Sequence, residues 1–377
     1  MQLKKVKTAV IGCGMISDIY LSNLKKFEVI DLVGCSDLVS EKSQKQAEKY
    51  GIRQMTNEEI LEDSEIELVL NLTYASAHYE VSRDILLAGK HCYSEKMMCL
   101  TMAEADELRR ISREKGVYFA VAPDTFLGAS QQTARMIIDR GLIGTPISAV
   151  ANLCRGYFMI KSTADDLYRK YSVMDAGGGI PYDMGGYYLH QLFNIAGPVE
   201  SVGGYITTLN KERPYLNPKH EKFNDTYTVN TSNTVCASMK FKNGMFGVLN
   251  ISSEMHYTNH SFTVYGTEGT LHMADPNDFG SPIYIEKNGQ KYEFPLSHPF
   301  AQNSRGVGAA DIAYAIRACR EPRLSTEMGY HAIEIINGII ESTKTGRIVS
   351  LDTDFERPEP ISTEFYGGAC EERSLFI

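Results

Sequence analysis

Short apolar runs alternate with polar or amphipathic segments through the first third of the chain. The apolar runs predict buried strands at residues 6–11, 29–37, 66–73, 91–96 and 117–123. The segments between them predict helices at residues 17–26, 40–51, 78–90 and 101–116. Strict alternation of this kind is typical of an α/β fold that is built on a doubly wound parallel sheet.

The pattern changes after about residue 124. A helix is expected over 129–141, and segments separated by turns then alternate apolar and polar residues, most clearly at 233–253 and 283–294. Each of these two segments contains an Asn-Gly pair typical of a type I′ hairpin turn, namely Asn243-Gly244 and Asn288-Gly289. This part of the chain therefore predicts an open, mostly antiparallel sheet.

The remaining segments complete the expected domain organisation. Helices are predicted again at 306–319 and 327–345, and a polar tail follows from about residue 352. A length of 377 residues suits two domains better than one core. We therefore expect a doubly wound domain over residues 1–123 and an α/β domain with the antiparallel sheet over residues 124–377.

Composition narrows the class of protein. With a net charge of −9, the chain disfavours nucleic acid as a partner, because binding to phosphates needs clustered Lys and Arg. No apolar run is long enough to span a bilayer, and the first residues run straight into a strand rather than a signal peptide. The eight cysteines are scattered without paired metal-ligand spacing. We expect a cytoplasmic protein with no metal site.

The stretch AVIGCGMISD, residues 9–18, joins the first strand to the first helix. Its Gly12 and Gly14 let the backbone approach a pyrophosphate closely, and the following helix N-terminus favours negative charge. Met15 and Ile16 complete this candidate cofactor-binding turn, although a serine stands where the fingerprint has its third glycine. Asp37 ends the second strand, where a carboxylate accepts hydrogen bonds from ribose and favours NAD over NADP.

Polar residues also follow the third and fourth predicted strands of the first domain. Thr73, Tyr74 and His78 come after one strand, and Glu95 and Lys96 come at the end of the next. Ligands of open α/β sheets bind at the carboxyl ends of the strands. These residues are therefore further candidates for cofactor binding, and Lys96 is also a candidate for orienting a substrate hydroxyl.

A third cluster lies in DAGGGIPYDMGGYYLHQLFNIAG, residues 175–197. Asp183, Tyr187 and His190 are spaced by four and three residues, so we expect them to share one face of a helix. A carboxylate, a phenol and an imidazole on one face can orient a hydroxyl group and take its proton. The three are therefore candidates for both catalysis and substrate binding.

Together, these motifs resemble the Gfo/Idh/MocA family of NAD(P)-dependent sugar and polyol oxidoreductases. The resemblance implies a Rossmann domain, a second α/β domain whose open sheet often builds oligomer interfaces, and a nicotinamide in the crevice between them. By position, Lys96 matches the family lysine that contacts substrate, and Asp183 matches the carboxylate beside it. The chain departs from the family pattern at Tyr74 and Met97, where proline is usual, and at Tyr187, where histidine is usual.

The last departure leaves two candidate bases. A neutral imidazole with a pKa near ~6.5 suits proton abstraction at neutral pH, which slightly favours His190. Tyr187, with an ordinary pKa of about 10, would need Lys96 to lower that pKa. His190 is the first expectation, with Tyr187 as the alternative or a relay.

Softer candidates for substrate contact lie in the second domain. Asp124 begins that domain, and Arg155 and Tyr157 follow a predicted strand. The apolar residues at 157–159 suit an aglycone, so oxidation of a glucoside at ring C3, even with an aromatic aglycone, is a specific expectation. Arg305 precedes a predicted helix and fits either the pocket or an interdomain salt bridge.

We therefore expect a homo-oligomeric NAD-dependent oxidoreductase that acts on a secondary hydroxyl of a small carbohydrate, polyol or glycoside. One rival within enzymes keeps NAD bound and uses transient oxidation to eliminate or cleave a glycoside. A rival of another class is a non-catalytic regulator that senses NAD or a sugar. Retention of Lys96, Asp183 and a nearby base argues against the regulator.

Overall fold

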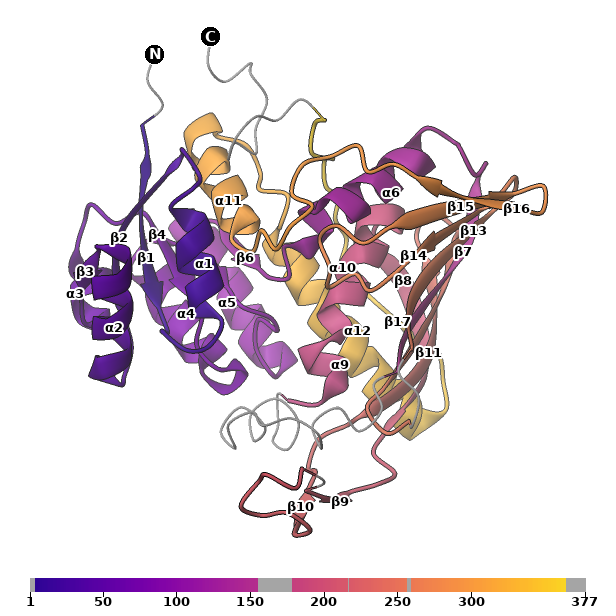
Figure 1. Ribbon diagram of the computed structural model, residues 1–377, viewed down its shortest axis with the longest axis horizontal. Coiled ribbons are helices and arrows are strands. Elements are labelled where there is room, and N and C mark those ends of the chain that lie inside the picture. Colours follow the sequence, from indigo (N-terminus) through magenta and orange to yellow (C-terminus); the bar gives the residue numbers. More distant parts are fainter. Residues whose placement is uncertain (1–3, 155–177, 216, 256–258, 364–377) are drawn as a thin grey trace.

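Two sheets divide the chain, as the computed structural model shows (Figure 1). The structure describes residues 4–154, 178–215, 217–255 and 259–363. A six-stranded sheet lies in the N-terminal part, and a nine-stranded sheet lies in the C-terminal part. This arrangement confirms the predicted α/β class with two different kinds of sheet.

The N-terminal sheet is a Rossmann sheet. Its strands run in the order β3-β2-β1-β4-β5-β6, and every neighbouring pair is parallel. The strands are β1 (Val6–Ile11), β2 (Ile30–Ser36), β3 (Arg53–Gln54), β4 (Leu68–Asn71), β5 (His91–Ser94) and β6 (Phe119–Val121). The helices are α1 (Ser17–Leu24), α2 (Ser40–Tyr50), α3 (Asn57–Glu62), α4 (His78–Leu87) and α5 (Met102–Lys115).

Short elements were missing from the sequence prediction of this domain. The hydrophobic pattern did not predict β3 or α3, because neither has a recognisable periodicity. Both residues of β3 are exposed, and Ile60 is the one buried residue of α3. The short helix is nevertheless held by a capping box between Thr56 and Glu59.

The C-terminal sheet is mixed but mostly antiparallel. Its order is β16-β15-β14-β13-β7-β12-β11-β8-β17, and only the β7–β12 pair is parallel. Its strands are β7 (Pro146–Cys154), β8 (Val199–Thr207), β11 (Thr234–Phe241), β12 (Phe246–Ser252), β13 (Asn259–Gly266), β14 (Thr270–Met273), β15 (Ile283–Lys287), β16 (Gln290–Phe294) and β17 (Val349–Ser350). A separate two-stranded ribbon consists of β9 (Glu212–Pro214) and β10 (Thr226–Thr228).

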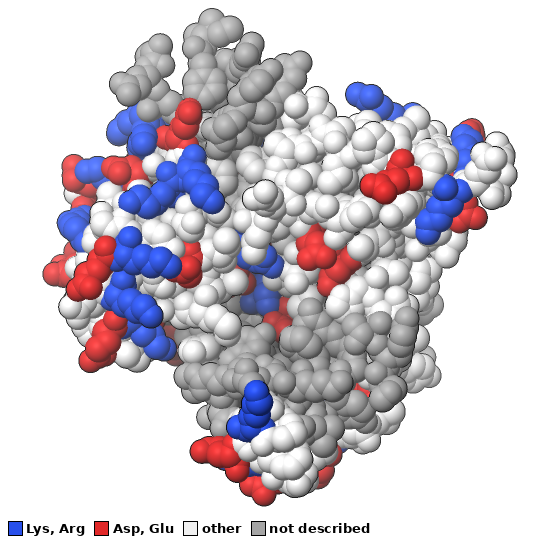
Figure 2. Space-filling model, in the orientation of Figure 1, with Lys and Arg blue, Asp and Glu red and all other residues white. Residues whose placement is uncertain are grey.

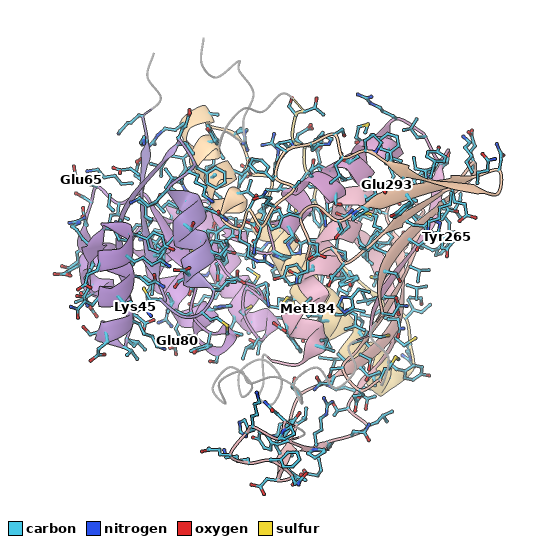
Figure 3. The ribbon with its side chains drawn as sticks, in the orientation of Figure 1. Lys45, Glu65, Glu80, Met184, Tyr265 and Glu293 are labelled. Carbon is cyan, nitrogen blue, oxygen red and sulfur yellow. The ribbon has the colours of Figure 1, made fainter. Side chains whose placement is uncertain are left out.

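Helices cover one face of this sheet. Figure 1 shows α6, α10 and α12 on its inner side, toward the Rossmann domain. The helices of this part are α6 (Ala129–Asp139), α9 (Ile180–Asp183), α10 (Gly185–Ala196), α11 (Val307–Ala318) and α12 (Thr326–Thr345). No helix in the described part of the chain lies on the outer face, where Tyr265 points away from the molecule (Figure 3).

The two predicted hairpin turns differ. At Asn288-Gly289 both residues have positive φ, 54° and 73°, which confirms the type I′ geometry between β15 and β16. Between β11 and β12 only Gly244 has positive φ, 90°, so the prediction of a type I′ turn at Asn243 is wrong. There the Asn243 side chain accepts a hydrogen bond from Met245 N, and the loop is longer than two residues.

The last two helices join the domains. Arg317 of α11 pairs with Glu67 before β4, and Tyr330 of α12 donates to Asp106 of α5. The expected polar tail packs against the second domain as far as it is described, because Ile361 is buried and its N–H donates to Gln132 on α6. The carboxyl ends of the Rossmann strands therefore face α9, α10 and the N-terminus of α11.

Candidate active site

The glycine turn after β1 has the shape that a pyrophosphate needs. Gly12 has φ of 102°, and a Cβ there would lie 2.6 Å from the backbone of Leu72, so only glycine fits against the end of β4. A Cβ on Gly14 would meet nothing within 4 Å, which leaves open space above the turn. Met15 is exposed and Ile16 is the N-cap of α1. The turn therefore fits a dinucleotide at the N-terminus of α1.

Two polar residues brace this turn. Asp37 accepts hydrogen bonds from Cys13 N at 2.7 Å and from Val39 N at 2.8 Å, which places its carboxylate beside the turn. The Ser17 hydroxyl donates to Gly14 O at 2.7 Å. Ser17 therefore acts as a local tie in the position where the sequence fingerprint has its third glycine.

The ends of β4 and β5 are tied together by His78. Its Nδ1 lies 2.7 Å from Met97 O, and its Nε2 lies 3.1 Å from Thr73 O. Burial lowers the pKa of His78, so the imidazole is neutral and donates to one of these two carbonyls. His78 therefore positions the segment that carries Lys96. Tyr74, by contrast, is exposed on the approach to this edge.

Glu95 points into the domain rather than toward the crevice. Its Oε1 accepts a hydrogen bond of 2.6 Å from Tyr20 of α1, whose hydroxyl also lies 3.2 Å from that of Tyr93. Its Oε2 accepts from Lys96 N at 3.1 Å. This buried network explains how a carboxylate is held directly behind Lys96. Sequence reasoning missed both tyrosines, which sit in ordinary helix and strand positions.

Lys96 is the centre of the candidate active site. Its Nζ donates to Asp183 Oδ1 at 2.8 Å and to Asp183 O at 2.7 Å, and it lies 5.6 Å from the centroid of the Tyr187 ring. Burial alone would lower the pKa of Lys96, but Asp183, Tyr187 and Glu95 outweigh it and hold the pKa above its usual range. The ammonium therefore stays charged, and its third N–H has no described acceptor.

The helix that carries this cluster is broken. α9 ends at Asp183 and α10 begins at Gly185, with Met184 at the break, where Figure 3 labels it facing the Rossmann domain. The three residues therefore do not lie on one continuous helix as predicted: Asp183 ends α9, whereas Tyr187 and His190 both lie on α10. Asp183 and Tyr187 nevertheless both contact Lys96.

His190 lies apart from the lysine. Its ring packs between Phe126 and Phe193 at centroid distances of 6.2 and 5.6 Å, and its Nδ1 is 2.9 Å from Gly186 O. Burial lowers the pKa of His190 to about 4, and its buried Nε2 has no hydrogen-bond partner. Among the described contacts, none joins His190 to Lys96 or Asp183.

Asp124 caps a helix. Its Oδ2 accepts hydrogen bonds from Gly306 N at 2.7 Å and Gly308 N at 3.1 Å, at the start of α11. Burial raises the pKa of Asp124 to about 6 against the opposing effect of these two donors. The described hydrogen bonds of this carboxylate therefore come from the backbone, and contact of Asp124 with substrate stays a prediction.

Arg305 reaches the site from the residue before that helix start. Its Nη2 lies 3.5 Å from the Tyr187 hydroxyl and 2.5 Å from Asn277 Oδ1, and its Nη1 donates to Asn303 Oδ1 at 2.8 Å. The interdomain salt bridge that the sequence allowed is absent from the described contacts of Arg305. Asn277, which follows β14, gave no signal in the sequence. Arg155 and Tyr157 lie outside the described residues.

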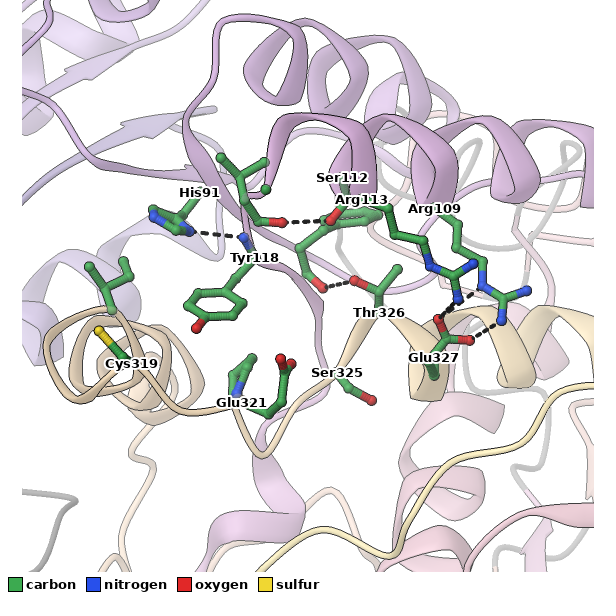
Figure 4. A pocket seen from close by; sticks show the side chains of 15 residues that line it. His91, Arg109, Ser112, Arg113, Tyr118, Cys319, Glu321, Ser325, Thr326 and Glu327 are labelled. Atoms are coloured by element: carbon green, nitrogen blue, oxygen red, sulfur yellow. Dashed lines mark hydrogen bonds and ion pairs between the residues drawn. The ribbon is translucent and has the colours of Figure 1, made fainter.

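The surface is hollowed between the two domains, and Lys or Arg and Asp or Glu side chains line this hollow (Figure 2). A separate pocket of about 510 Å³ lies elsewhere (Figure 4). Its wall includes His91 and Tyr118, which lie at the amino ends of β5 and β6. Because the strands are parallel, this second pocket is at the edge of the sheet opposite Lys96.

Comparisons with known proteins agree with this geometry. The profile of the oxidoreductase family with an NAD-binding Rossmann fold matches residues 6–122, and that of the GFO/IDH/MocA C-terminal domain matches residues 131–272. The chain belongs to the Gfo/Idh/MocA family. Its N-terminal domain is thus an NAD-binding Rossmann domain, and the protein is an oxidoreductase.

Several relatives of this Gfo/Idh/MocA protein have named activities. It is 21% identical over 363 residues to the scyllo-inositol 2-dehydrogenase (NADP(+)) IolW of Bacillus subtilis, covering 92% of this chain and 96% of the relative. It is 22% identical over 289 residues to the myo-inositol 2-dehydrogenase of Thermotoga maritima, covering 76% and 80%. The structure of levoglucosan dehydrogenase with NADH superposes with a TM-score of 0.78 at 19% identity, covering 93% and 100% of the two chains.

The described ranges also bear on metal binding and on membrane spanning. No group of three or more His, Cys, Asp or Glu side chains is arranged to hold a metal ion there. None of the helices in those ranges combines the length and the apolar character that crossing a membrane requires.

Proposed function

We propose that this protein oxidises a secondary hydroxyl of a sugar, polyol or glycoside with NAD, or reduces the corresponding ketone. The observation that carries the proposal is the Lys96–Asp183–Tyr187 cluster at the carboxyl ends of the strands, on the same edge as the glycine turn. The named inositol dehydrogenases among the relatives, and levoglucosan dehydrogenase among the structures, support a polyhydroxylated substrate.

Gly12, Gly14 and the N-terminus of α1 would hold the pyrophosphate, and Asp37 would hold the adenosine ribose. When bound, NAD supplies the hydride acceptor. Asp37 beside the turn favours NAD over NADP, because a carboxylate repels a 2′-phosphate.

The chain's own residues orient the substrate and move its proton. The free N–H of Lys96 donates to the reacting oxygen, and Asp183 fixes the ammonium through two hydrogen bonds. Tyr187 exchanges the hydroxyl proton. Burial raises the pKa of Tyr187 although Lys96 and Arg305 oppose it, so the resting phenol is protonated and ready to donate in ketone reduction. Alcohol oxidation then gains from higher pH.

Tyr187 is preferred to His190 as the proton-transfer residue because of position. Tyr187 lies against Lys96 and Arg305, whereas the ring of His190 is packed between two phenylalanines. His190 as the base, which the sequence slightly favoured, is therefore the second choice.

Oxidation of a glucoside at ring C3 stays a prediction from the sequence, because residues 157–159 are not described. Location in the cytoplasm likewise stays a prediction. The outer face of the large sheet supports a homo-oligomer, since Tyr205, Phe246 and Val248 expose 70%, 57% and 38% of their surface there.

The proposal is tested by following NADH absorbance over a panel of sugars, inositols and glycosides, with NAD and NADP in parallel. We expect turnover with at least one polyhydroxylated substrate and a preference for NAD. No turnover with any substrate contradicts the dehydrogenase proposal, and equal use of NADP contradicts the role of Asp37.

A further inference from the structure

Arg305 differs from the other arginines of the described ranges. Every other arginine that is buried or half-buried there has a carboxylate within 4.0 Å. Arg305 is half-buried, yet its described hydrogen bonds go to two amide oxygens and one phenol. A guanidinium is always charged, and although Asp124 acts on Arg305 electrostatically, no carboxylate of the described residues forms an ion pair with it.

The neighbouring acids are committed elsewhere. Asp183 is paired with Lys96. Asp124 holds the first N–H groups of α11, and Glu95 is bonded to Tyr20 and to the backbone. Arg305 is therefore the charged group beside Tyr187 that keeps N–H donors without a described acceptor.

Two N–H groups of the Arg305 guanidinium have no described acceptor. Its described bonds use Nη1 once and Nη2 twice, so the Nε–H and the second Nη1–H of Arg305 have no described acceptor. Asn277 and Asn303 hold the group in place by hydrogen bonds of 2.5 and 2.8 Å. A fixed cation with two unused donors fits the single charge and the two oxygens of a carboxylate.

We propose that the substrate is an acidic sugar, and that Arg305 binds its carboxylate while Lys96 and Tyr187 act on one of its secondary hydroxyls. This inference rests on the proposed function, because it assigns a substrate class to the same site. Arg305 approaches from the second domain and Lys96 from the first, so a bound acid would bridge the two across Tyr187.

The test compares matched pairs that differ only in the carboxylate, such as D-glucuronate with D-glucose and D-galacturonate with D-galactose. For the wild type we expect kcat/KM with NAD to favour an acid over its neutral partner by about tenfold to hundredfold, the usual effect of a charge-assisted hydrogen bond. Arg305→Gln should reduce that ratio by about the same factor, and Arg305→Lys should keep part of it. Arg317→Gln, which removes a half-buried arginine away from the site, should leave the ratio unchanged.

Calorimetric titration of the same pairs into the protein with NADH separates this inference from the proposed function. Tighter binding of the acids that depends on Arg305, without turnover, supports the binding of a carboxylate by Arg305 and contradicts the dehydrogenase. Oxidation of neutral sugars as fast as the acids, or an equal loss on both in Arg305→Gln, overturns the inference while the dehydrogenase stands.

Discussion

Lys96 and Asp183 are joined by two hydrogen bonds, from one ammonium to both the side-chain and the backbone oxygen of the same residue. Lys96 follows β5 of the Rossmann domain, and Asp183 ends α9 of the second domain. The pair therefore joins the Rossmann side of the site to the second-domain side through Lys96 Nζ, the atom that would polarise a substrate oxygen.

Replacing Lys96 with methionine should lower kcat about 10²- to 10³-fold, because the reacting oxygen loses its charged donor. NADH affinity, measured by titration of the coenzyme's own fluorescence, should change little, since the glycine turn is untouched. Lys90→Met is the matched control, because Lys90 is also buried but donates to backbone carbonyls of Asp63 and Ile66. A Lys96→Met enzyme with normal kcat would contradict the role of the ammonium.

Replacing Tyr187 with phenylalanine should lower kcat about 10²- to 10⁴-fold, the usual contribution of a positioned acid or base. In the wild type, kcat/KM for oxidation should rise with pH into the alkaline range, because burial raises the pKa of the phenol. His190→Leu should instead lower the melting temperature, since it removes a ring from between Phe126 and Phe193. If His190→Leu removes the pH dependence and Tyr187→Phe does not, the base is His190.

Most of the Rossmann domain and half of the site could be predicted from sequence, because the relevant signals are local. A buried strand, two glycines and an acid at the next strand end occur in order along the chain, and parallel strands bring their ends together. The family resemblance, rather than any local signal, placed Asp183 beside Lys96, and the two residues form an ion pair between the domains.

The rest depended on tertiary packing that no spacing reveals. Spacing alone does not reveal that Asp183 and Tyr187 contact Lys96 while His190, one turn after Tyr187 on α10, packs among aromatic rings. Asp124 became a helix cap because α11, far along the chain, begins beside it. Arg305 and Asn277 are 28 residues apart in the chain and meet only through the tertiary structure.

Asp124 should make the free energy of unfolding depend on pH. Its pKa is raised to about 6 by burial, so the folded protein binds this proton more tightly than the unfolded chain. Asp124 contributes its whole share of the free energy of unfolding below pH 4, which is about the pKa of aspartate in the unfolded chain. That contribution is lost, by on the order of 2 kcal/mol, as the pH rises through 6. Urea unfolding of Asp124→Asn from pH 4 to pH 7 should be flatter than that of the wild type.

Asp311 gives the control of opposite sign. It too is buried, but Arg323 and Arg320 outweigh burial and lower the pKa of Asp311. Asp311 therefore stabilises the fold above the pKa that it has in the unfolded chain, and this stabilisation is lost as the pH falls. Asp311→Asn should therefore cost stability at neutral pH. Equal pH profiles for Asp124→Asn and the wild type would contradict the ascribed titration.

The open sheet face should govern assembly. Val248 pairs with Val150 across β12 and β7 on that face, and aspartate there would be buried without a partner in an interface. Val248→Asp should convert the oligomer to monomers in light scattering after size exclusion. Leu87→Asp, on the Rossmann domain, should keep the oligomer. A wild-type protein that is monomeric at micromolar concentration would contradict the oligomer proposal.

The most direct test of the central claim follows the hydrogen itself. A sugar substrate deuterated at the carbon that bears the reacting hydroxyl is mixed with enzyme and NAD, and the products are read by mass spectrometry. The account predicts one deuterated NADH for each ketone formed, and loss of both in Tyr187→Phe. Consumption of the sugar with cleaved or eliminated product and no deuterated NADH in solution would contradict it and favour transient oxidation.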